Sequence, residues 1–203
     1  MNKLILRIKN KAFREFNNGL LKTINFRLVK EFPRGSVEFA KKYFKNKIID
    51  VIEIGVFKGE NAKNMFKNLN INKFYAIDPY KEYKEYSKIE PWMTQSFLNK
   101  VETIAKNKLK NKNISWIKDF SDKAIYKIPK VNFIYVDGIH SYGQIKKDMN
   151  NYWEKVKEGG ILAGHDICES FDNYGTIKAF TEFCTENNLK PYISKWDWWV
   201  IKQ

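Results

Sequence analysis

The chain has 203 residues, 43% of them hydrophobic and 16% aromatic, which is enough to bury the core of one ordinary domain. It contains no run of about 18 apolar residues, so the sequence predicts no membrane-spanning helix. The net charge is +14, and residues 1–47 carry most of it, with 13 Lys and Arg against 3 Asp and Glu.

The first 47 residues have the pattern of amphipathic helices. Apolar residues recur at steps of three and four between residues 3 and 30, with a break near 17–19, which predicts two short helices. A turn at 33–35 follows, then a helix over 37–44 with Ser36 as its N-cap. We interpret residues 1–47 as a basic helical extension packed on the core. Its charge suits contact with nucleic acid, anionic lipid or an acidic substrate, but a plain solvated helical face is the preferred interpretation.

Charge and cysteine content bear on the compartment. Arg7 and Lys9 interrupt the apolar start before a signal-peptide core can form. The two cysteines, Cys168 and Cys184, are too few for a disulfide framework or a four-ligand zinc site. These features favour a reducing cytoplasm.

From residue 48 onward, short apolar runs alternate with helical stretches, the pattern of a parallel sheet with crossover helices. Helices are predicted at 60–69, 94–110, 142–157 and 174–188. Strands are predicted at 48–54, 73–78, 113–118, 131–137, 160–165, 191–195 and 197–202. The last two follow each other without a helix, which predicts a closing antiparallel hairpin. Residues 48–203 are therefore expected to form one α/β domain, with a seven-stranded, mostly parallel sheet and helices on both faces.

A glycine turn follows the first predicted strand. The strand contains Glu53 and leads through Gly55 and Gly59 into a helix. Glycine lacks Cβ, so such a turn bends sharply and lets a ligand lie against the backbone at a helix N-terminus. Asp78 ends the second strand, 19 positions after Gly59, where nucleotide-binding folds place the acid that receives ribose hydroxyls. Taken alone, Asp78 would be interpreted as a surface acid at a strand end; its distance from the glycine turn is what favours the ribose role.

These residues resemble the first two motifs of class I, Rossmann-like methyltransferases, which bind S-adenosylmethionine (SAM). The resemblance implies that Glu53 lies near the methionine part of SAM and that Asp78 holds the ribose. Phe57 stands where the fuller fingerprint has a middle glycine. This departure disfavours an NAD-dependent oxidoreductase, because a pyrophosphate needs the closer approach that glycine permits.

A second group of polar residues follows the fourth and fifth predicted strands. Asp137 and His140 come after one strand, and His165 and Asp166 come directly after the next. Ligands of open α/β sheets bind at the carboxyl ends of strands, so these four side chains are expected to converge. Carboxylate and imidazole bind divalent ions, and imidazole also takes protons at neutral pH. The alternative is structural, with His140 capping a helix and His165 packed under it.

The surrounding segments, 137–142 and 159–166, resemble methyltransferase family 24, which is similar to the metal-dependent macrolide-sugar and catechol-type O-methyltransferases. The resemblance covers roughly residues 48–188. It implies that Asp137, His165 and Asp166 are metal ligands and that His140 and Asp137 are catalytic. His165 stands where relatives often have an acid, so magnesium, manganese and no metal all remain open.

Two further segments have both a functional and a structural interpretation. Phe120 and Ser121 follow the third strand, where similar methyltransferases contact the adenine; a core aromatic and a helix cap are the alternatives. Aromatic residues after Asp78 suit a lid over a sugar or planar ring, or plain packing. They are Tyr80, Tyr83, Tyr86 and Trp92. The tryptophans of the last strands, 196, 198 and 199, are expected in the core or at a dimer surface.

The sequence thus predicts SAM-dependent O-methylation of a small hydroxylated acceptor, such as a sugar or glycan component, assisted by Mg or Mn if a metal is used. The alternatives are a nucleic-acid methyltransferase and a noncatalytic SAM-binding module that contacts the membrane surface through its N-terminus. The sequence leaves a homo-oligomer open.

Overall fold

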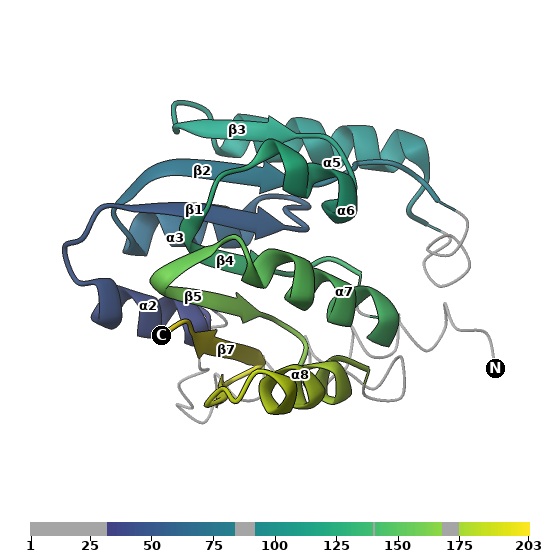
Figure 1. The fold of residues 1–203 in the computed structure, drawn as a ribbon. Coiled ribbons are helices and arrows are strands. Elements are labelled where there is room, and N and C mark those ends of the chain that lie inside the picture. The colour runs from purple at the N-terminus through teal and green to yellow at the C-terminus, as the bar shows by residue number, and fades with distance from the viewer. Residues whose placement is uncertain (1–31, 84–91, 140, 168–174) are drawn as a thin grey trace, which may run out of the picture. The chain divides into compact units, whose positions relative to one another are not determined.

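The structure is a computed structural model that describes residues 32–83, 92–139, 141–167 and 175–203 (Figure 1). The two helices predicted within residues 3–30 lie outside the described residues. The same is true of Tyr86, His140 and Cys168.

A single seven-stranded sheet forms the centre of the described part of the chain, in the order β3-β2-β1-β4-β5-β7-β6. The first five strands run parallel, and β7 pairs antiparallel with both β5 and β6. The strand number, the mostly parallel pairing and the closing hairpin confirm the predicted fold class. The bounds are β1 Ile49–Ile54, β2 Ile71–Ile77, β3 Ile114–Ile117, β4 Val131–Val136, β5 Val156–Gly164, β6 Tyr192–Ser194 and β7 Asp197–Ile201.

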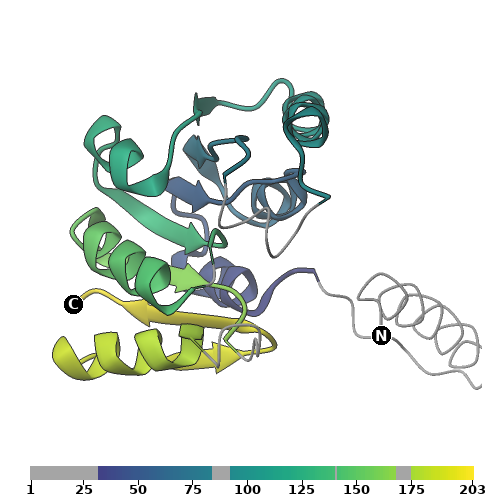
Figure 2. The same ribbon diagram turned by 90° about the vertical axis from the view of Figure 1, so that its right-hand side faces the viewer.

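Helices cover both faces of the sheet, as predicted (Figure 2). One face carries α2 (Gly35–Phe44), α3 (Glu60–Asn68) and α5 (Gln95–Lys108). The other carries α6 (Ser121–Ala124), the short 3-10 helix η1 (Ile125–Lys127), α7 (Tyr142–Trp153) and α8 (Gly175–Glu186). Two apolar clusters follow from this layering, one on each face of the buried strands. The two helical layers cover both faces of the central strands, so β1 and β4 are buried almost throughout and most of their residues are apolar.

The helix α2 falls within the segment that was predicted to be an N-terminal extension. Its apolar residues Val37, Ala40 and Phe44 pack in the same cluster as β1 and β7. The compact unit that contains the sheet begins at Phe32. Residues 32–47 are therefore part of the structural unit that carries the sheet.

Two local predictions were wrong. Ser36 lies inside α2, whose N-cap is Arg34, and its backbone N–H and hydroxyl both donate to Asp197 Oδ2 on β7. The carboxylate of a distant strand thus satisfies the orphan amide at this helix start. The fifth strand, predicted to begin at residue 160, begins instead at Val156, because Gly159 and Gly160 form backbone hydrogen bonds with Lys202.

The C-terminal hairpin packs tightly on the sheet. Trp198 is fully buried on one face and Trp199 is 4% exposed on the other, whereas Trp196 is exposed. The Trp198 ring lies so close to Gly164 that a Cβ on this glycine would come within 2.2 Å of it. In the part of the chain that the structure describes, no helix is long and apolar enough to cross a membrane.

Candidate functional site

The turn after β1 holds two glycines in the left-handed region of backbone space. Gly55 has φ +85° and Gly59 has φ +71°. A Cβ on Gly55 would sit 2.0 Å from the carbonyl oxygen of Asp137, so the glycine is needed where the ends of β1 and β4 meet. Gly59 is the N-cap of α3, and its open face packs against Leu109 after α5. Both glycines therefore also serve packing within the protein.

Asp78 joins this turn to the end of β2. Its Oδ2 accepts the backbone N–H of Phe57 at 2.9 Å, and its Oδ1 accepts that of Tyr80 at 2.8 Å. The Tyr80 hydroxyl in turn donates to the Phe57 carbonyl at 3.0 Å. Phe57 has φ +48°, a conformation that favours glycine, and these bonds hold it there. Burial raises the pKa of Asp78, while the backbone donors oppose that rise.

Glu53 lies on β1, buried beneath the turn at 1% exposure. Asn61 on α3 donates to its Oε1 at 2.9 Å, and its Oε2 has no hydrogen-bond partner among the described residues. Burial raises the pKa of Glu53 to about 8. Within the described part of the chain, Glu53 thus keeps a polar atom without a hydrogen-bond partner beneath the glycine turn.

A cavity of about 310 Å³ opens over these strand ends. Five of the predicted site residues line it: Gly55, Asp78, Phe120, Ser121 and Asp137. Glu53, Gly59, His165 and Asp166 are not among its described lining residues. The structure thus brings the ends of four parallel strands to one hollow, as the carboxyl-end rule for open α/β sheets expects.

The wall after β3 contains an acid that sequence reasoning missed. The Ser121 hydroxyl donates to Asp148 Oδ1 at 2.6 Å, and Gln144 Nε2 donates to the same oxygen at 3.0 Å. Ser121 is the first residue of α6 and not its cap. Burial raises the pKa of Asp148 to about 6. Gln144 and Asp148 are one helical turn apart on α7, and such a polar pair on the inner face of a helix was the available signal.

Aromatic side chains form part of the cavity rim. Phe57, Tyr83 and Trp92 all border the cavity. Tyr83 packs edge-on against Phe120 at 5.6 Å between ring centroids, and Trp92 packs edge-on against Phe97 at 5.1 Å. The aromatic residues predicted after Asp78 therefore border the same hollow, as far as the structure describes them.

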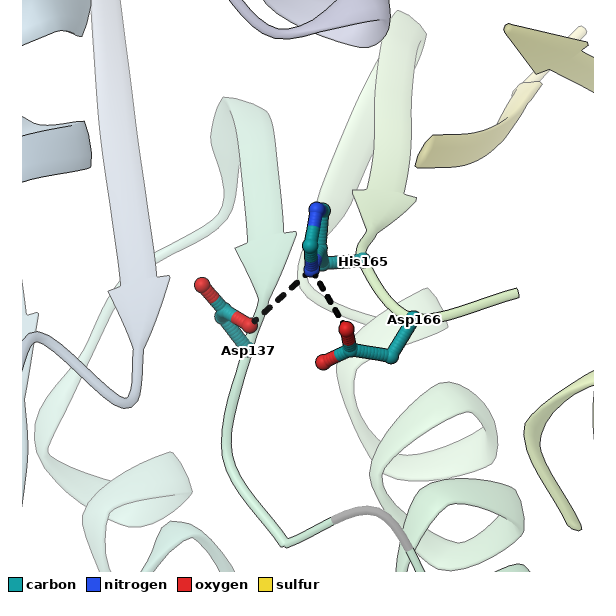
Figure 3. A group of neighbouring side chains, drawn as sticks. All are labelled: Asp137, His165 and Asp166. Atoms are coloured by element: carbon teal, nitrogen blue, oxygen red, sulfur yellow. Dashed lines mark ion pairs between the residues drawn. The ribbon is translucent and has the colours of Figure 1, made fainter. Parts of the chain in front are cut away.

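Asp137, His165 and Asp166 form a compact polar group beyond β4 and β5 (Figure 3). One ligand atom from each lies within 4.8 Å of the others. His165 Nδ1 is 2.7 Å from Asp166 Oδ1 and 3.9 Å from Asp137 Oδ1. Burial alone would lower the pKa of His165, but the hydrogen bond to Asp166 and the nearby carboxylates raise it. Two carboxylates and one imidazole are donors that divalent transition ions accept, so this set fits a metal.

Arg34, just before α2, reaches the same group and was missed by sequence reasoning. Its Nη1 donates to Asp137 Oδ2 at 3.0 Å and to the Tyr135 hydroxyl at 2.8 Å. The Tyr135 hydroxyl donates in turn to Asp197 Oδ1 at 2.8 Å. Burial opposes the charge of Arg34, but Asp137 and the other partners raise its pKa above the ordinary value. No local motif marks Arg34, because its partner lies 103 residues away.

Comparison with known proteins places these observations in a family. Residues 52–167, more than half of the chain, match a family described as a methyltransferase domain. An uncharacterised protein of Acanthamoeba polyphaga mimivirus is 27% identical over 133 residues, which cover 61% of this chain and 53% of that protein. The chain thus spans about half the length of the curated relative it matches.

Several solved structures share the fold. An rRNA methylase from Streptococcus thermophilus has a TM-score of 0.58 at 13% identity, covering 87% of this chain and 100% of its own. The MycE methyltransferase of the mycinamycin pathway, solved with Mg and SAH, has a TM-score of 0.57 at 12% identity, covering 87% and 50%. The O-methyltransferase NovP has a TM-score of 0.56 at 12% identity, covering 83% and 79%. At such identities these likenesses establish the fold alone.

Proposed function

This chain belongs to the methyltransferase-domain family that its residues 52–167 match, and from that premise we propose that it transfers the methyl group of SAM to a hydroxyl oxygen of a small acceptor, such as a sugar or glycan component. SAM supplies a methyl group on a sulfonium ion that is ready for attack by an oxygen nucleophile. The protein then has to bind the donor, orient the acceptor and remove the hydroxyl proton.

One observation carries the proposal: Asp137 belongs to both halves of the site. It lines the cavity together with Gly55 and Asp78, and it is also one of the three clustered donors with His165 and Asp166. An acceptor hydroxyl held at the cluster is thereby next to a donor held in the cavity. This adjacency is what a direct transfer between two small molecules requires.

We assign the cavity to the nucleoside of SAM. On this proposal Asp78 receives the ribose hydroxyls while its backbone donors keep the carboxylate oriented, and Phe120 and Ser121 border the adenine. Gly55 keeps the turn close to the ligand, and Gly59 starts the helix behind it. Glu53 lies beneath the turn with an unused carboxyl oxygen, which suits the charged methionine end of SAM.

For the acceptor side, we assign Asp137, His165 and Asp166 as the ligands of a divalent ion, Mg or Mn, whose positive charge would orient and acidify the hydroxyl. The MycE methyltransferase, whose structure contains Mg and SAH, supports this assignment by analogy. His140 lies outside the described residues and is proposed as the base that takes the hydroxyl proton, or as an acceptor-orienting residue. As the new O–CH3 bond forms and the S–CH3 bond breaks, that proton must leave the oxygen.

The aromatic rim indicates the kind of acceptor. Phe57, Tyr83 and Trp92 present rings beside the cavity, and rings pack well against the apolar face of a sugar or against a planar ring. The polar groups of the site therefore lie at the cluster of Asp137, His165 and Asp166, and its apolar surface lies at the aromatic rim. This division suits a molecule with hydroxyls on one side and carbon surface on the other.

The test is methyl transfer from labelled SAM to a panel of sugars, glycosides and catechols, with and without EDTA. We expect label in a hydroxylated acceptor, loss of turnover in EDTA, and recovery with Mg or Mn. Full turnover in EDTA would contradict the metal assignment but leave the proposed methyl transfer intact. A folded protein that fails to bind SAM or SAH in calorimetry would contradict the donor assignment itself.

A nucleic-acid acceptor is the second candidate, because residues 1–47 concentrate the positive charge of the chain. Such an enzyme would bind RNA or DNA with an affinity that falls steeply as salt rises. A flat salt dependence would discard it. Liposome flotation with and without residues 1–31 tests the remaining alternative, a SAM-binding module held at a membrane surface.

A further inference from the structure

Arg34 places a permanent positive charge directly on one of the proposed metal ligands. Its guanidinium donates to Asp137 Oδ2, and the other oxygen of the same carboxylate, Oδ1, faces His165. The two side chains are only 11% and 17% exposed, so solvent screens this contact poorly. Guanidinium remains protonated at every pH at which the protein is studied.

The position of Arg34 is fixed by a buried chain of hydrogen bonds. Arg34 donates to the Tyr135 hydroxyl, which donates to Asp197, and Asp197 also accepts the backbone N–H and hydroxyl of Ser36. Tyr135, Asp197 and Ser36 are all at most 1% exposed. The guanidinium also lies over the Tyr135 ring, with Cζ 5.6 Å from its centroid. A surface arginine that met Asp137 by chance would not be held at several points.

We propose that Arg34 is a positioning residue that competes with the divalent ion for Asp137 and thereby keeps the metal affinity of the site low. The inference rests on the metal assignment of the proposed function. An ion at the cluster would share the Asp137 carboxylate with the guanidinium and experience its like charge at short range. Removing that charge should therefore strengthen ion binding, even though it also removes a structural hydrogen bond.

The direct test measures Mn²⁺ binding to the full chain for the wild type and for Arg34→Gln. Electron paramagnetic resonance reports the concentration of unbound Mn²⁺ during the titration. Glutamine keeps a hydrogen-bond donor and loses the charge. We expect the variant to bind Mn²⁺ about tenfold more tightly, an order of magnitude set by the Coulomb interaction at partly screened short range. A purely structural role for Arg34 predicts the opposite change, because a loosened site binds ions less well.

Three matched variants define the result. Tyr135→Phe removes a partner of Arg34 but keeps the charge, so its Mn²⁺ affinity should equal that of the wild type. Asp166→Asn should abolish binding in both the wild-type and the Arg34→Gln backgrounds. If Arg34→Gln does not fold by circular dichroism, Arg34→Lys is measured instead. Its shorter side chain draws the charge back from Asp137, and a rise of a few fold is expected.

The outcomes separate this inference from the proposed function. An unchanged or weaker Mn²⁺ affinity in the folded Arg34 variant would overturn the competition. If no variant bound Mn²⁺ detectably while SAH still bound, both the competition and the metal assignment would be wrong. The assignment of SAM as the methyl donor would be unaffected. Failure of the wild type to bind SAH would instead contradict the SAM-binding assignment, on which the competition between Arg34 and the ion does not depend.

Discussion

The two sides of the candidate site hold their acids differently. The proposed donor side lies at the ends of β1, β2 and β3, and the proposed acceptor side lies at the ends of β4 and β5. On the donor side, Asp78 accepts from Phe57 and Tyr80, 21 and 2 residues away, and Glu53 accepts from Asn61, 8 residues away. On the acceptor side, Asp137 is held by Arg34, 103 residues away. The partners of Glu53 and Asp78 thus lie within 21 residues of them in the sequence, whereas Asp137 depends on an arginine that is far away in the sequence. His165 and Asp166, which are consecutive, are the local pair of the acceptor side.

The first prediction concerns the point where the two sides touch. Gly55→Ala would place Cβ 2.0 Å from the Asp137 carbonyl oxygen, at a backbone φ of +85° that alanine disfavours. We expect a loss of more than about 3 kcal/mol in the free energy of unfolding, measured by urea denaturation.

Gly143→Ala is the matched control for this change. Gly143 lies in α7, and nothing stands within 4 Å of the point that a Cβ would occupy there. Alanine at this position should be neutral or stabilise by up to about 1 kcal/mol. If the two substitutions changed the free energy of unfolding equally, the close approach of Gly55 to the Asp137 carbonyl would not be what requires a glycine.

The second prediction isolates the donor side. Asp78→Ala removes an acceptor of two backbone N–H groups and the proposed ribose ligand. Each charge-assisted bond contributes about 1.5–3 kcal/mol, so SAH affinity should fall about 100-fold in calorimetry. Asp50→Ala, near the start of β1 and remote from the cavity lining, should bind SAH as the wild type does. A weak effect of Asp78→Ala would mean that the ribose lies elsewhere.

The third prediction uses the buried carboxyl of Glu53. Its pKa is about 8 in the folded protein, and an unfolded glutamate titrates near 4.5. Between these pH values the unfolded chain has lost a proton that the folded chain still holds, so wild-type stability falls as the pH rises. Glutamine has no proton to lose and can still accept from Asn61. Glu53→Gln should therefore gain stability relative to the wild type from pH 5 to pH 8; a difference that does not vary with pH would contradict this.

The smallest effect is expected in the wall after β3. Ser121→Ala removes the hydroxyl donor to Asp148, while Gln144 still donates to the same oxygen. We expect about 1 kcal/mol of destabilisation and only a few-fold loss of SAH affinity. Thr185→Ala provides a control, because its hydroxyl donates to a backbone carbonyl on the exposed side of α8. A loss of SAH affinity as large as that of Asp78→Ala would make this wall a main determinant of donor binding.

The same contrast explains what the sequence could and could not predict. Alternating apolar and helical stretches predicted all seven strands. Burial on both faces leaves a clear apolar pattern in central strands such as β1 and β4, whereas the edge strands β3 and β6 are less buried and were placed by their position in the alternation. Glu53, Asp78, Asp137 and Asp166 could be placed in or just beyond strands because each stands within or close behind an apolar run. Arg34 and Asp197 carry no such signal, since only the folded chain brings them to Tyr135. Ser36 was mistaken for a cap because capping statistics cannot register a carboxylate supplied by β7, 161 residues later.

The last strand in the chain, β7, has a consequence for biosynthesis. Asp197 supports Tyr135 and Ser36, and the adjacent Trp198 donates its indole N–H to the His165 carbonyl at 3.0 Å. Both residues come later in the chain than every proposed ligand. During synthesis, the glycine turn and the ends of β1 to β5 leave the ribosome before β7 does. Until β7 emerges, the cluster of Asp137, His165 and Asp166 lacks the hydrogen bonds that Asp197 and Trp198 provide around it. The proposed acceptor site should thus become able to bind its substrate only in a late step, once β7 leaves the exit tunnel and pairs with β5.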